Sequence, residues 1–213
     1  MSSKKSKADL KVVILGDKDV GKTSLICRYI DGKFVTTDST IGASFFMKHW
    51  GPYNVAVWDT AGEERFTGLS SFYCRNAGAA IFAFNLNCLK SFESLGMRFL
   101  PLLSSAQDSC LKIVVGTKYD ITSPGSRQVS VEAAEKLALE MNANQPMEKL
   151  QKPPYFETSS RTGYNVDEVF EYILQYCLPY TSDLAIKPTH SKSTVNLSDV
   201  KNQTHLKENK CCT

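Results

Sequence analysis

The chain has 213 residues, enough for one ordinary domain with some additional chain, and 42% of its residues are hydrophobic and 22% are charged. This composition is typical of a globular protein and excludes disorder over the whole length. The formal charge of +3, from 25 Lys and Arg against 22 Asp and Glu, does not indicate a nucleic-acid-binding protein, and we expect no nucleic acid as a partner. No signal-peptide-like apolar region and no run of about 18 apolar residues is present, so the sequence favours neither secretion nor membrane spanning.

Short β-branched runs alternate with helical stretches along the chain. In chain order, the pattern predicts a strand over 10–15, a helix over 22–29, a hairpin of two strands over 44–50 and 54–59, a strand over 79–84, a helix over 91–103, a strand over 111–115, and helices over 131–141 and 166–177. Strands that alternate with helices in this way predict an α/β fold with a doubly wound, mostly parallel sheet.

The regular pattern ends near Pro179, which stops the last predicted helix, and no hydrophobic periodicity follows it. We therefore expect a flexible N-terminus over 1–8, one domain over 9–179 and a disordered C-terminal tail over 180–213. Five of the seven cysteines stand singly among apolar neighbours, which is typical of reduced cysteines in a cytosolic protein. The other two are adjacent in the tail.

The segment Gly16–Thr23 is GDKDVGKT and fits the pattern G-x-x-x-x-G-K-[ST], directly after a predicted strand and at the start of a predicted helix. In this pattern, the backbone N–H groups of the loop and the helix N-terminus face phosphate oxygens. We expect Lys22 to reach the β- and γ-phosphates, and the hydroxyl of Thr23 to bind Mg²⁺. The predicted phosphate-binding residues also include Asp19, Val20, Gly21 and Ser24.

Two acidic residues at strand ends extend this prediction. Asp59 ends the second hairpin strand, where a carboxylate can hold Mg²⁺ through water. Asp120 closes the run Thr117–Asp120 (TKYD) after the strand over 111–115, and open α/β sheets bind ligands at the carboxyl ends of their parallel strands. The Asp120 carboxylate can accept hydrogen bonds from N1 and N2 of guanine, which adenine does not offer, so we predict a guanine nucleotide.

Taken in this order, the motifs resemble those of the Ras-superfamily small GTPases and, within them, the Rab proteins. The resemblance extends from about residue 9 to residue 178, and its further motifs are STIG at 39–42, WDTAGEERF at 58–66 and ETSSR at 157–161. The stretches MKHW, YNVAVWDTAG and FYCRNAGAAI are most similar to the divergent Rab-twenty subgroup. The resemblance implies the small G domain of P-loop NTPases: a mostly parallel six-stranded sheet with helices on both faces, bound GTP or GDP with Mg²⁺, and hydrolysis of GTP.

The resemblance also assigns roles outside the phosphate loop. Thr40 would contact the γ-phosphate and Mg²⁺, Gly62 would sense the γ-phosphate through its backbone N–H, and Phe34 would stack on guanine. The Mg²⁺ ligands are then Thr23, Thr40 and Asp59, and the residues expected to act in hydrolysis are Lys22, Thr40, Gly62 and Glu63. The guanine-binding set is Thr117, Lys118, Asp120, Ser159, Ser160 and Arg161, and the effector-binding set is Phe45, Trp58 and Tyr73.

Several residues depart from the family pattern. Glu63 stands where the family has the glutamine that orients the attacking water, so we expect slow intrinsic hydrolysis. Thr117 stands in place of Asn, so we expect guanine selectivity with weakened affinity. Lys18 occupies a phosphate-loop position usually held by a small residue, where it either crowds the γ-phosphate region or points to solvent. The segment 142–154, with three prolines, is interpreted as an insertion in a surface loop.

The chain ends in KCCT, and the placement of Cys211 and Cys212 does not form a C-a-a-X box. Paired terminal cysteines on a polar tail resemble the doubly geranylgeranylated tails of Rab proteins, and stable anchoring requires two lipid chains. The alternative is a pair of exposed thiols. We therefore expect attachment to a membrane through geranylgeranyl groups on both residues.

The sequence thus predicts a monomeric, membrane-anchored GTP/GDP switch of vesicle traffic. Its expected location is the cytoplasmic face of endomembranes, endosomal, phagosomal or Golgi, with a cytosolic pool. The resemblance implies an exchange factor, a GTPase-activating protein, a prenylation escort, a dissociation inhibitor and effectors as partners. One alternative is a Rab-like module that stays GTP-loaded and barely hydrolyses, which Glu63 favours. Another is a P-loop kinase, whose second substrate site and arginine-rich lid are not evident in the sequence.

Overall fold

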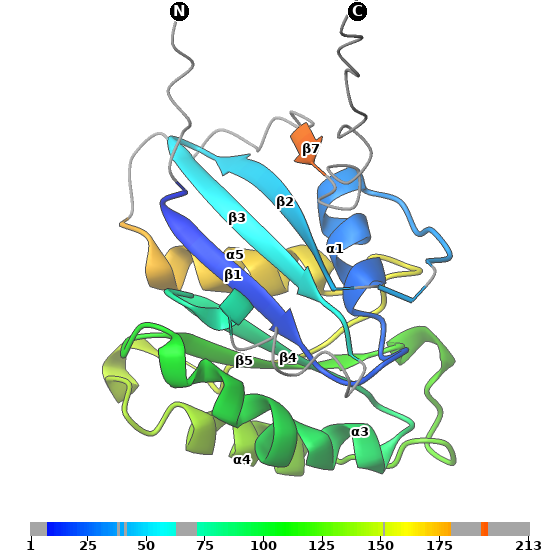
Figure 1. Ribbon diagram of the computed structural model, residues 1–213. Helices are drawn as coiled ribbons and strands as arrows, with labels where there is room; N and C mark the ends of the chain where they lie inside the picture. The colour runs from blue at the N-terminus through cyan, green and yellow to red at the C-terminus, as the bar shows by residue number, and fades with distance from the viewer. Residues whose placement is uncertain are drawn as a thin grey trace, which may run out of the picture.

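A computed structural model of the chain describes residues 8–37, 39–40, 42–62, 72–150, 152–179 and 193–195. A central sheet has the strand order β6-β5-β4-β1-β3-β2-β7 (Figure 1). Its strands are β1 (Leu10–Leu15), β2 (Ala43–Trp50), β3 (Tyr53–Thr60), β4 (Ala79–Asn85), β5 (Leu111–Thr117), β6 (Tyr155–Glu157) and β7 (Ser193–Val195). β2 is antiparallel to β3 and β7, and the other neighbouring strands pair in parallel. The predicted α/β fold with its six-stranded, mostly parallel sheet, β1 to β6, is confirmed.

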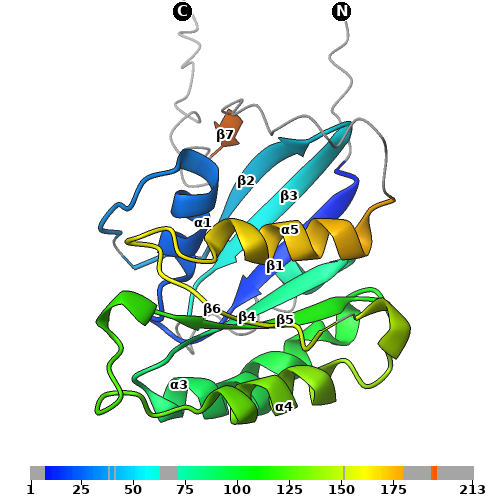
Figure 2. The same ribbon diagram turned by 180° about the vertical axis from the view of Figure 1, so that it is seen from behind.

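Helices cover both faces of this sheet, with α1 and α5 on one face and α3 and α4 on the other (Figures 1 and 2). The helices are α1 (Lys22–Asp31), α3 (Leu89–Ser94), α4 (Val131–Met141) and α5 (Val166–Cys177). Shorter turns are the π-helical η2 (Leu95–Phe99) and the 3₁₀-helical η3 (Leu100–Ser105), η4 (Tyr119–Ile121) and η5 (Met147–Lys149).

Two apolar layers follow from the alternation of side chains along the buried strands. In β1, Val12 and Ile14 belong to the cluster that packs against α1 and α5, whereas Val13 and Leu15 belong to the cluster that packs against α4. All four side chains are fully buried. Because both faces of the central strands are covered, these strands are continuously apolar, and this made them recognisable in the sequence.

The helix predicted over 91–103 is not one α-helix. The α-helical part ends at Ser94 and continues as π-helical η2 and then as η3, with Pro101 near the start of η3. Proline lacks the N–H that an α-helix needs and crowds the preceding turn, so a regular helix does not continue through it. Leu95 and Phe99 are nevertheless buried, which explains the helical spacing of the apolar residues.

The segment 142–154 is more than the surface insertion that the sequence suggested. Asn142 is fully buried, and its side chain accepts a hydrogen bond from the backbone N–H of Lys112 at 3.0 Å and donates to the Lys112 carbonyl at 2.6 Å. The hydroxyl of Tyr176 on α5 donates to Oε1 of Gln145 at 3.0 Å. These contacts attach the segment to β5 and α5, and a sequence does not reveal such distant partners.

The short strand β7 lies within the range that was predicted as a disordered tail, and pairs Val195 with Phe45 of the edge strand β2. The rest of the predicted tail, 180–192 and 196–213, lies outside the described residues. In the part of the chain that the structure describes, every helix is too short or too polar to span a bilayer.

Candidate functional site

A cavity of about 350 Å³ opens at the edge of the sheet where β1, β3, β5 and β6 end. The predicted residues that line it are Asp19, Val20, Gly21, Lys22, Thr23, Ser24, Phe34, Thr40, Gly62, Thr117, Lys118, Asp120, Ser160 and Arg161. It is also lined by Lys18, Thr36, Thr37, Ser39 and Ile121. Residues from five separate segments of the sequence therefore meet at one place, as the rule for open α/β sheets predicts.

The loop between β1 and α1 surrounds the side chain of Lys22, whose residue is 6% exposed. Its ammonium group donates to the carbonyls of Gly16 at 2.9 Å and Asp17 at 2.8 Å. Burial lowers the pKa of Lys22 to about 8, and Asp59 opposes this shift most strongly. A bound polyphosphate would favour the charged ammonium, because opposite charges stabilise each other in a buried site.

Backbone geometry also shapes this loop. Asp19 has a φ of 60°, and Lys118, which also lines the cavity, has a φ of 63°. Positive φ is uncommon outside glycine and is often found where a functional site imposes it. A Cβ atom on Gly62 would collide with the backbone of Asp17 and Lys18, so the backbone of Gly62 lies directly against the loop. Any larger residue at position 62 would push these two segments apart.

Three oxygen-bearing side chains converge at the α1 end of the cavity. The hydroxyl of Thr23 donates to Oδ2 of Asp59 at 2.6 Å, and the hydroxyl of Thr40 donates to the same oxygen at 3.2 Å. The two hydroxyl oxygens are 2.9 Å apart. Asp59 does not line the cavity but lies directly behind the two threonines, fully buried.

This donor set fits a hard divalent cation. Oδ1 of Asp59 is buried and has no hydrogen-bond partner among the described residues. Burial raises the pKa of Asp59, although Thr23, Lys22 and Thr40 counteract this shift. Mg²⁺ prefers oxygen ligands and keeps several waters, so two hydroxyls and one carboxylate fit a magnesium ion that also binds phosphate.

At the other end of the cavity, Asp120 is held by the segment after β6. The hydroxyl of Ser159 donates to Oδ1 of Asp120 at 2.7 Å and accepts from the N–H of Thr162 at 3.1 Å. Ser159 is fully buried and does not line the cavity itself, unlike Ser160. The second oxygen of the Asp120 carboxylate can accept hydrogen bonds from a ligand, as guanine recognition requires.

Thr117, in place of the family's Asn, connects this end of the cavity to the phosphate loop. Its hydroxyl is 2.6 Å from the carbonyl of Val20 and 2.8 Å from the carbonyl of Phe84. The residue is 2% exposed. Thr117 therefore retains a contact between β5 and the phosphate loop despite the substitution.

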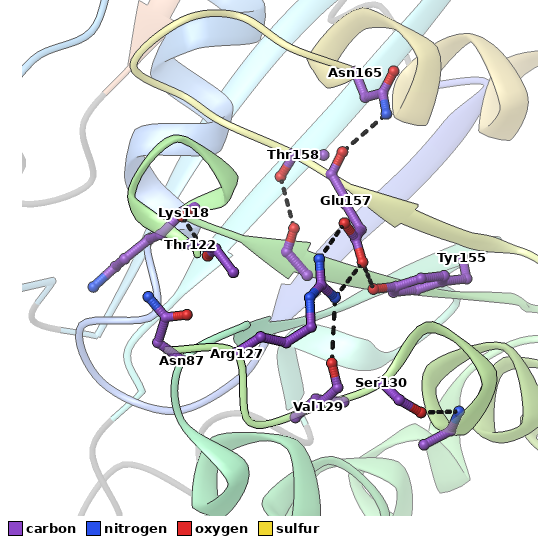
Figure 3. A network of polar contacts seen from close by, with 12 residues as sticks. Asn87, Lys118, Thr122, Arg127, Val129, Ser130, Tyr155, Glu157, Thr158 and Asn165 are labelled. Carbon is purple, nitrogen blue, oxygen red and sulfur yellow. Dashed lines mark hydrogen bonds and ion pairs between the residues drawn. The ribbon is translucent and has the colours of Figure 1, made fainter. Parts of the chain in front are cut away.

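Figure 3 shows a polar network around Glu157, at the end of β6 and next to the predicted guanine-binding residues. Arg127 makes two parallel hydrogen bonds to the carboxylate of Glu157, at 2.7 and 2.8 Å, and the hydroxyl of Tyr155 donates to Glu157 at 2.8 Å. The side chain of Asn165 donates to the carbonyl of Glu157 at 3.0 Å (Figure 3). These contacts join the segment before α4 to the end of β6, which the predicted guanine-binding residues Ser159, Ser160 and Arg161 follow.

The predicted effector-binding residues form one aromatic group on the β2–β3 side. Phe45 and Trp58 meet edge to face with ring centroids 5.2 Å apart, and Trp58 and Tyr73 are stacked at 5.6 Å. All three side chains are partly exposed. A contiguous, half-exposed aromatic group is a surface to which a partner can bind.

Some contributing residues had no signal in the sequence. Arg127 belongs to no motif, and the partner that it binds is 30 positions away. Asp17 forms an ion pair at 2.5 Å with Arg98 of η2, and Arg98 also belongs to no motif. The sequence could have predicted Thr36, Thr37 and Ser39 as cavity-lining residues, because they lie between Phe34 and Thr40, which were predicted. Glu63, Cys211 and Cys212 lie outside the described residues.

Lys18, one of the departures from the family pattern, lines the cavity and is exposed to solvent.

Comparison with known proteins gives an independent view of the chain. The model of the Ras family matches residues 11–178. The human Ras-related protein Rab-20 is 37% identical over 224 aligned residues, which cover 92% of this chain and 94% of that protein. Ras-related protein Rab-24 of Dictyostelium discoideum is 35% identical and covers 98% of this chain and 99% of its own length. Ras-related protein Rab7 of Prunus armeniaca is 38% identical over 79% of this chain and 82% of its own.

Proposed function

Because the chain belongs to the Ras family and is a divergent Rab GTPase, we propose that it works as a membrane-anchored GTP/GDP switch that regulates vesicle trafficking. As a small GTPase it binds guanine nucleotide and hydrolyses GTP. The proposal adds how the nucleotide state is sensed and where the protein acts.

The observation that carries the proposal is the meeting of Thr40 with Thr23 and Asp59 at one end of the cavity. These residues come from three separate segments, and Thr40 belongs to the exposed stretch between α1 and β2. Thr23, Thr40 and Asp59 would hold Mg²⁺, which supplies positive charge to the phosphates. With GTP bound, Thr40 is held at the γ-phosphate side and Gly62 donates its N–H there, whereas loss of the γ-phosphate releases both segments.

The remaining parts of the proposal follow from the family. Geranylgeranyl groups on Cys211 and Cys212 attach the tail to the cytoplasmic face of endosomal, phagosomal or Golgi membranes. An exchange factor loads GTP, a GTPase-activating protein ends the active state, and effectors bind the aromatic group of Phe45, Trp58 and Tyr73. A prenylation escort and a dissociation inhibitor handle the lipid-bearing form, which accounts for a cytosolic pool.

The nucleotide bound by the purified protein is the first test. We expect GTP or GDP, with ATP unable to displace it at equal concentration. Asp120→Ala is expected to lose guanine selectivity by a factor of about 100 or more, because the carboxylate is the group that accepts from guanine N1 and N2. Competition binding with GTP and ATP measures this ratio.

A control for the first test is Asp108→Ala, which removes an exposed carboxylate outside the cavity. Its selectivity is expected to equal that of the wild type. Retention of ATP, or equal binding of GTP and ATP by the wild type, would contradict the function.

A second candidate, a module that remains GTP-loaded, is favoured by the identity of Glu63. A carboxylate only accepts hydrogen bonds and repels phosphate oxygens, whereas glutamine can also donate. We expect Glu63→Gln to increase intrinsic single-turnover phosphate release by about 10- to 100-fold, with GTP affinity changed only a few-fold. Phosphate release from the GTP-loaded protein measures it.

Glu64→Gln, the same change at the neighbouring position, is the matched control and is expected to leave the rate unchanged. A Glu63→Gln rate equal to or below that of the wild type shows that position 63 does not limit hydrolysis. A wild-type rate too low to measure, restored by Glu63→Gln, supports the GTP-loaded module.

A further inference from the structure

An arginine of α1 contacts the segment 158–163 that follows β6. Arg28 donates from Nε to the carbonyl of Ser160 at 2.5 Å and from Nη2 to the carbonyl of Arg161. From Nη1 it donates to the carbonyl of Gly32 at 2.8 Å. Each guanidinium nitrogen therefore has its own backbone acceptor, and hydrogen bonds from a charged donor are stronger than neutral ones.

The acceptors of Arg28 belong to two segments of the chain that contribute residues to the cavity. Ser160 and Arg161 line the cavity. Gly32 caps the C-terminus of α1, two residues before Phe34, which also lines the cavity and is 48% exposed. Arg28 itself is not among the described residues that line the cavity. Its action on a ligand is therefore indirect.

The aliphatic part of the Arg28 side chain lies next to Gly163 of the same segment. A Cβ atom added to Gly163, which has a φ of 90°, would lie 3.9 Å from Cδ of Arg28, an ordinary van der Waals distance. The N–H of Gly163 in turn donates to the Ser159 carbonyl at 2.8 Å. The segment 158–163 is thus held by the hydrogen bonds of Arg28 to Ser160 and Arg161 and, at its start, by the hydrogen bond of Ser159 to Asp120.

The contact also has an electronic consequence. The carbonyl of Ser160 and the N–H of Arg161 belong to the same peptide group. A charged donor on the carbonyl oxygen polarises that group and strengthens hydrogen bonding by its N–H. A purine oxygen bound by the backbone N–H groups of this segment would gain from both the polarisation and the fixed position.

We propose that Arg28 is a positioning residue for guanine recognition. Arg28 holds the backbone of Ser160 and Arg161 against the base, and its bond to Gly32 connects that backbone to the segment containing Phe34. The inference rests on the proposed assignment of this cavity to guanine nucleotide. Because Arg28 acts on the base side and not on the phosphates, its loss affects GDP and GTP equally.

The test uses the full-length protein with Arg28→Gln, and Arg75→Gln, an exposed arginine away from the cavity, as matched control. Dissociation of fluorescent GDP and GTP is measured in the presence of Mg²⁺. For Arg28→Gln we expect both nucleotides to dissociate about tenfold faster and by the same factor, because one charge-assisted hydrogen bond is worth about this ratio. Arg75→Gln is expected to match the wild type.

Inosine triphosphate separates this role from that of Asp120, because it keeps the O6 oxygen of guanine and lacks the N2 amine. Arg28→Gln is expected to weaken GTP and inosine triphosphate together, so their affinity ratio stays within about twofold of the wild-type ratio. Asp120→Ala is expected to collapse that ratio. The unchanged ratio in Arg28→Gln and the lost ratio in Asp120→Ala separate the contact to the backbone of Ser160 and Arg161 from the recognition of the N2 amine.

Arg28→Lys is the conservative variant. Its nucleotide dissociation is expected to be faster than that of the wild type but slower than that of Arg28→Gln, because one ammonium cannot span three carbonyls. It also serves as the test if Arg28→Gln does not fold. Unchanged dissociation in Arg28→Gln, or in Arg28→Lys where Gln does not fold, overturns the inference, as does an effect confined to GTP. A wild-type protein without guanine nucleotide overturns the assignment of the cavity itself.

Discussion

Thr117 has one hydroxyl proton for two carbonyl acceptors, those of Val20 and Phe84. An asparagine amide would offer two donors and an additional acceptor at the same place. We therefore expect Thr117→Asn to slow GDP dissociation about fivefold, because one more buried hydrogen bond is worth about 1 kcal/mol. Stopped-flow or manual-mixing dissociation of fluorescent GDP measures it. Thr122→Asn, at a half-buried threonine outside the cavity, is the control. Dissociation as fast as in the wild type, or faster, would show that the buried site has no room for the amide.

At the scale of elements, the network in Figure 3 joins the segment before α4 to β6 through the ion pair of Arg127 and Glu157. Burial alone would raise the pKa of Glu157, but hydrogen bonds from Arg127 and Tyr155 outweigh it and the pKa is lowered. A carboxylate with a lowered pKa stabilises the fold above its unfolded pKa of about 4.3, and this stability is lost as the pH falls through the folded pKa. We expect Arg127→Gln to lower the free energy of unfolding by about 1–3 kcal/mol near pH 7. Below about pH 4 the difference from the wild type is expected to shrink.

Urea unfolding of the GDP-saturated protein at the two pH values measures this difference. Lys136→Gln removes one partner of an exposed ion pair between Lys136 and Glu140 and is the control, with an expected change below about 1 kcal/mol. A difference between Arg127→Gln and the wild type that is equally large at both pH values would contradict the role of the Glu157 charge.

At the scale of the whole molecule, the proposed membrane attachment is expected to be independent of the nucleotide-binding domain. The last helix of the sheet's covering layers, α5, ends at Cys177, and Cys211 and Cys212 lie more than 30 residues beyond it in the sequence. We expect the double variant Cys211→Ser, Cys212→Ser to move the protein from membranes to the cytosol, with nucleotide binding unchanged. A variant with one cysteine is expected to bind membranes only marginally, because a single lipid chain anchors weakly. Cell fractionation measures both. Cys88→Ser is the control, and a double variant that remains on membranes would refute the lipid anchor.

The sequence alone predicted the α/β class, the phosphate loop and the two acidic residues at strand ends, Asp59 and Asp120. Each of these predictions depends on residues that are neighbours in the chain. GDKDVGKT lies between a strand and a helix, so its local pattern is enough to predict phosphate binding. The alternation of apolar runs with helical stretches predicted the two-sided sheet for the same reason. The exception was the helix predicted over 91–103, where the apolar spacing remains helical although the α-helix ends at Ser94 and is followed by η2 and by η3, which contains Pro101.

Only the tertiary structure decided how these local pieces are held together. Arg28 and Ser160 are 132 positions apart, Thr117 and Val20 are 97 apart, and Asn142 and Lys112 are 30 apart. The strand order brings each pair into contact, and no periodicity in the sequence marks which distant carbonyl a side chain will meet. The acceptors are backbone groups, which every residue carries, so their positions depend on the path of the chain and not on residue identity.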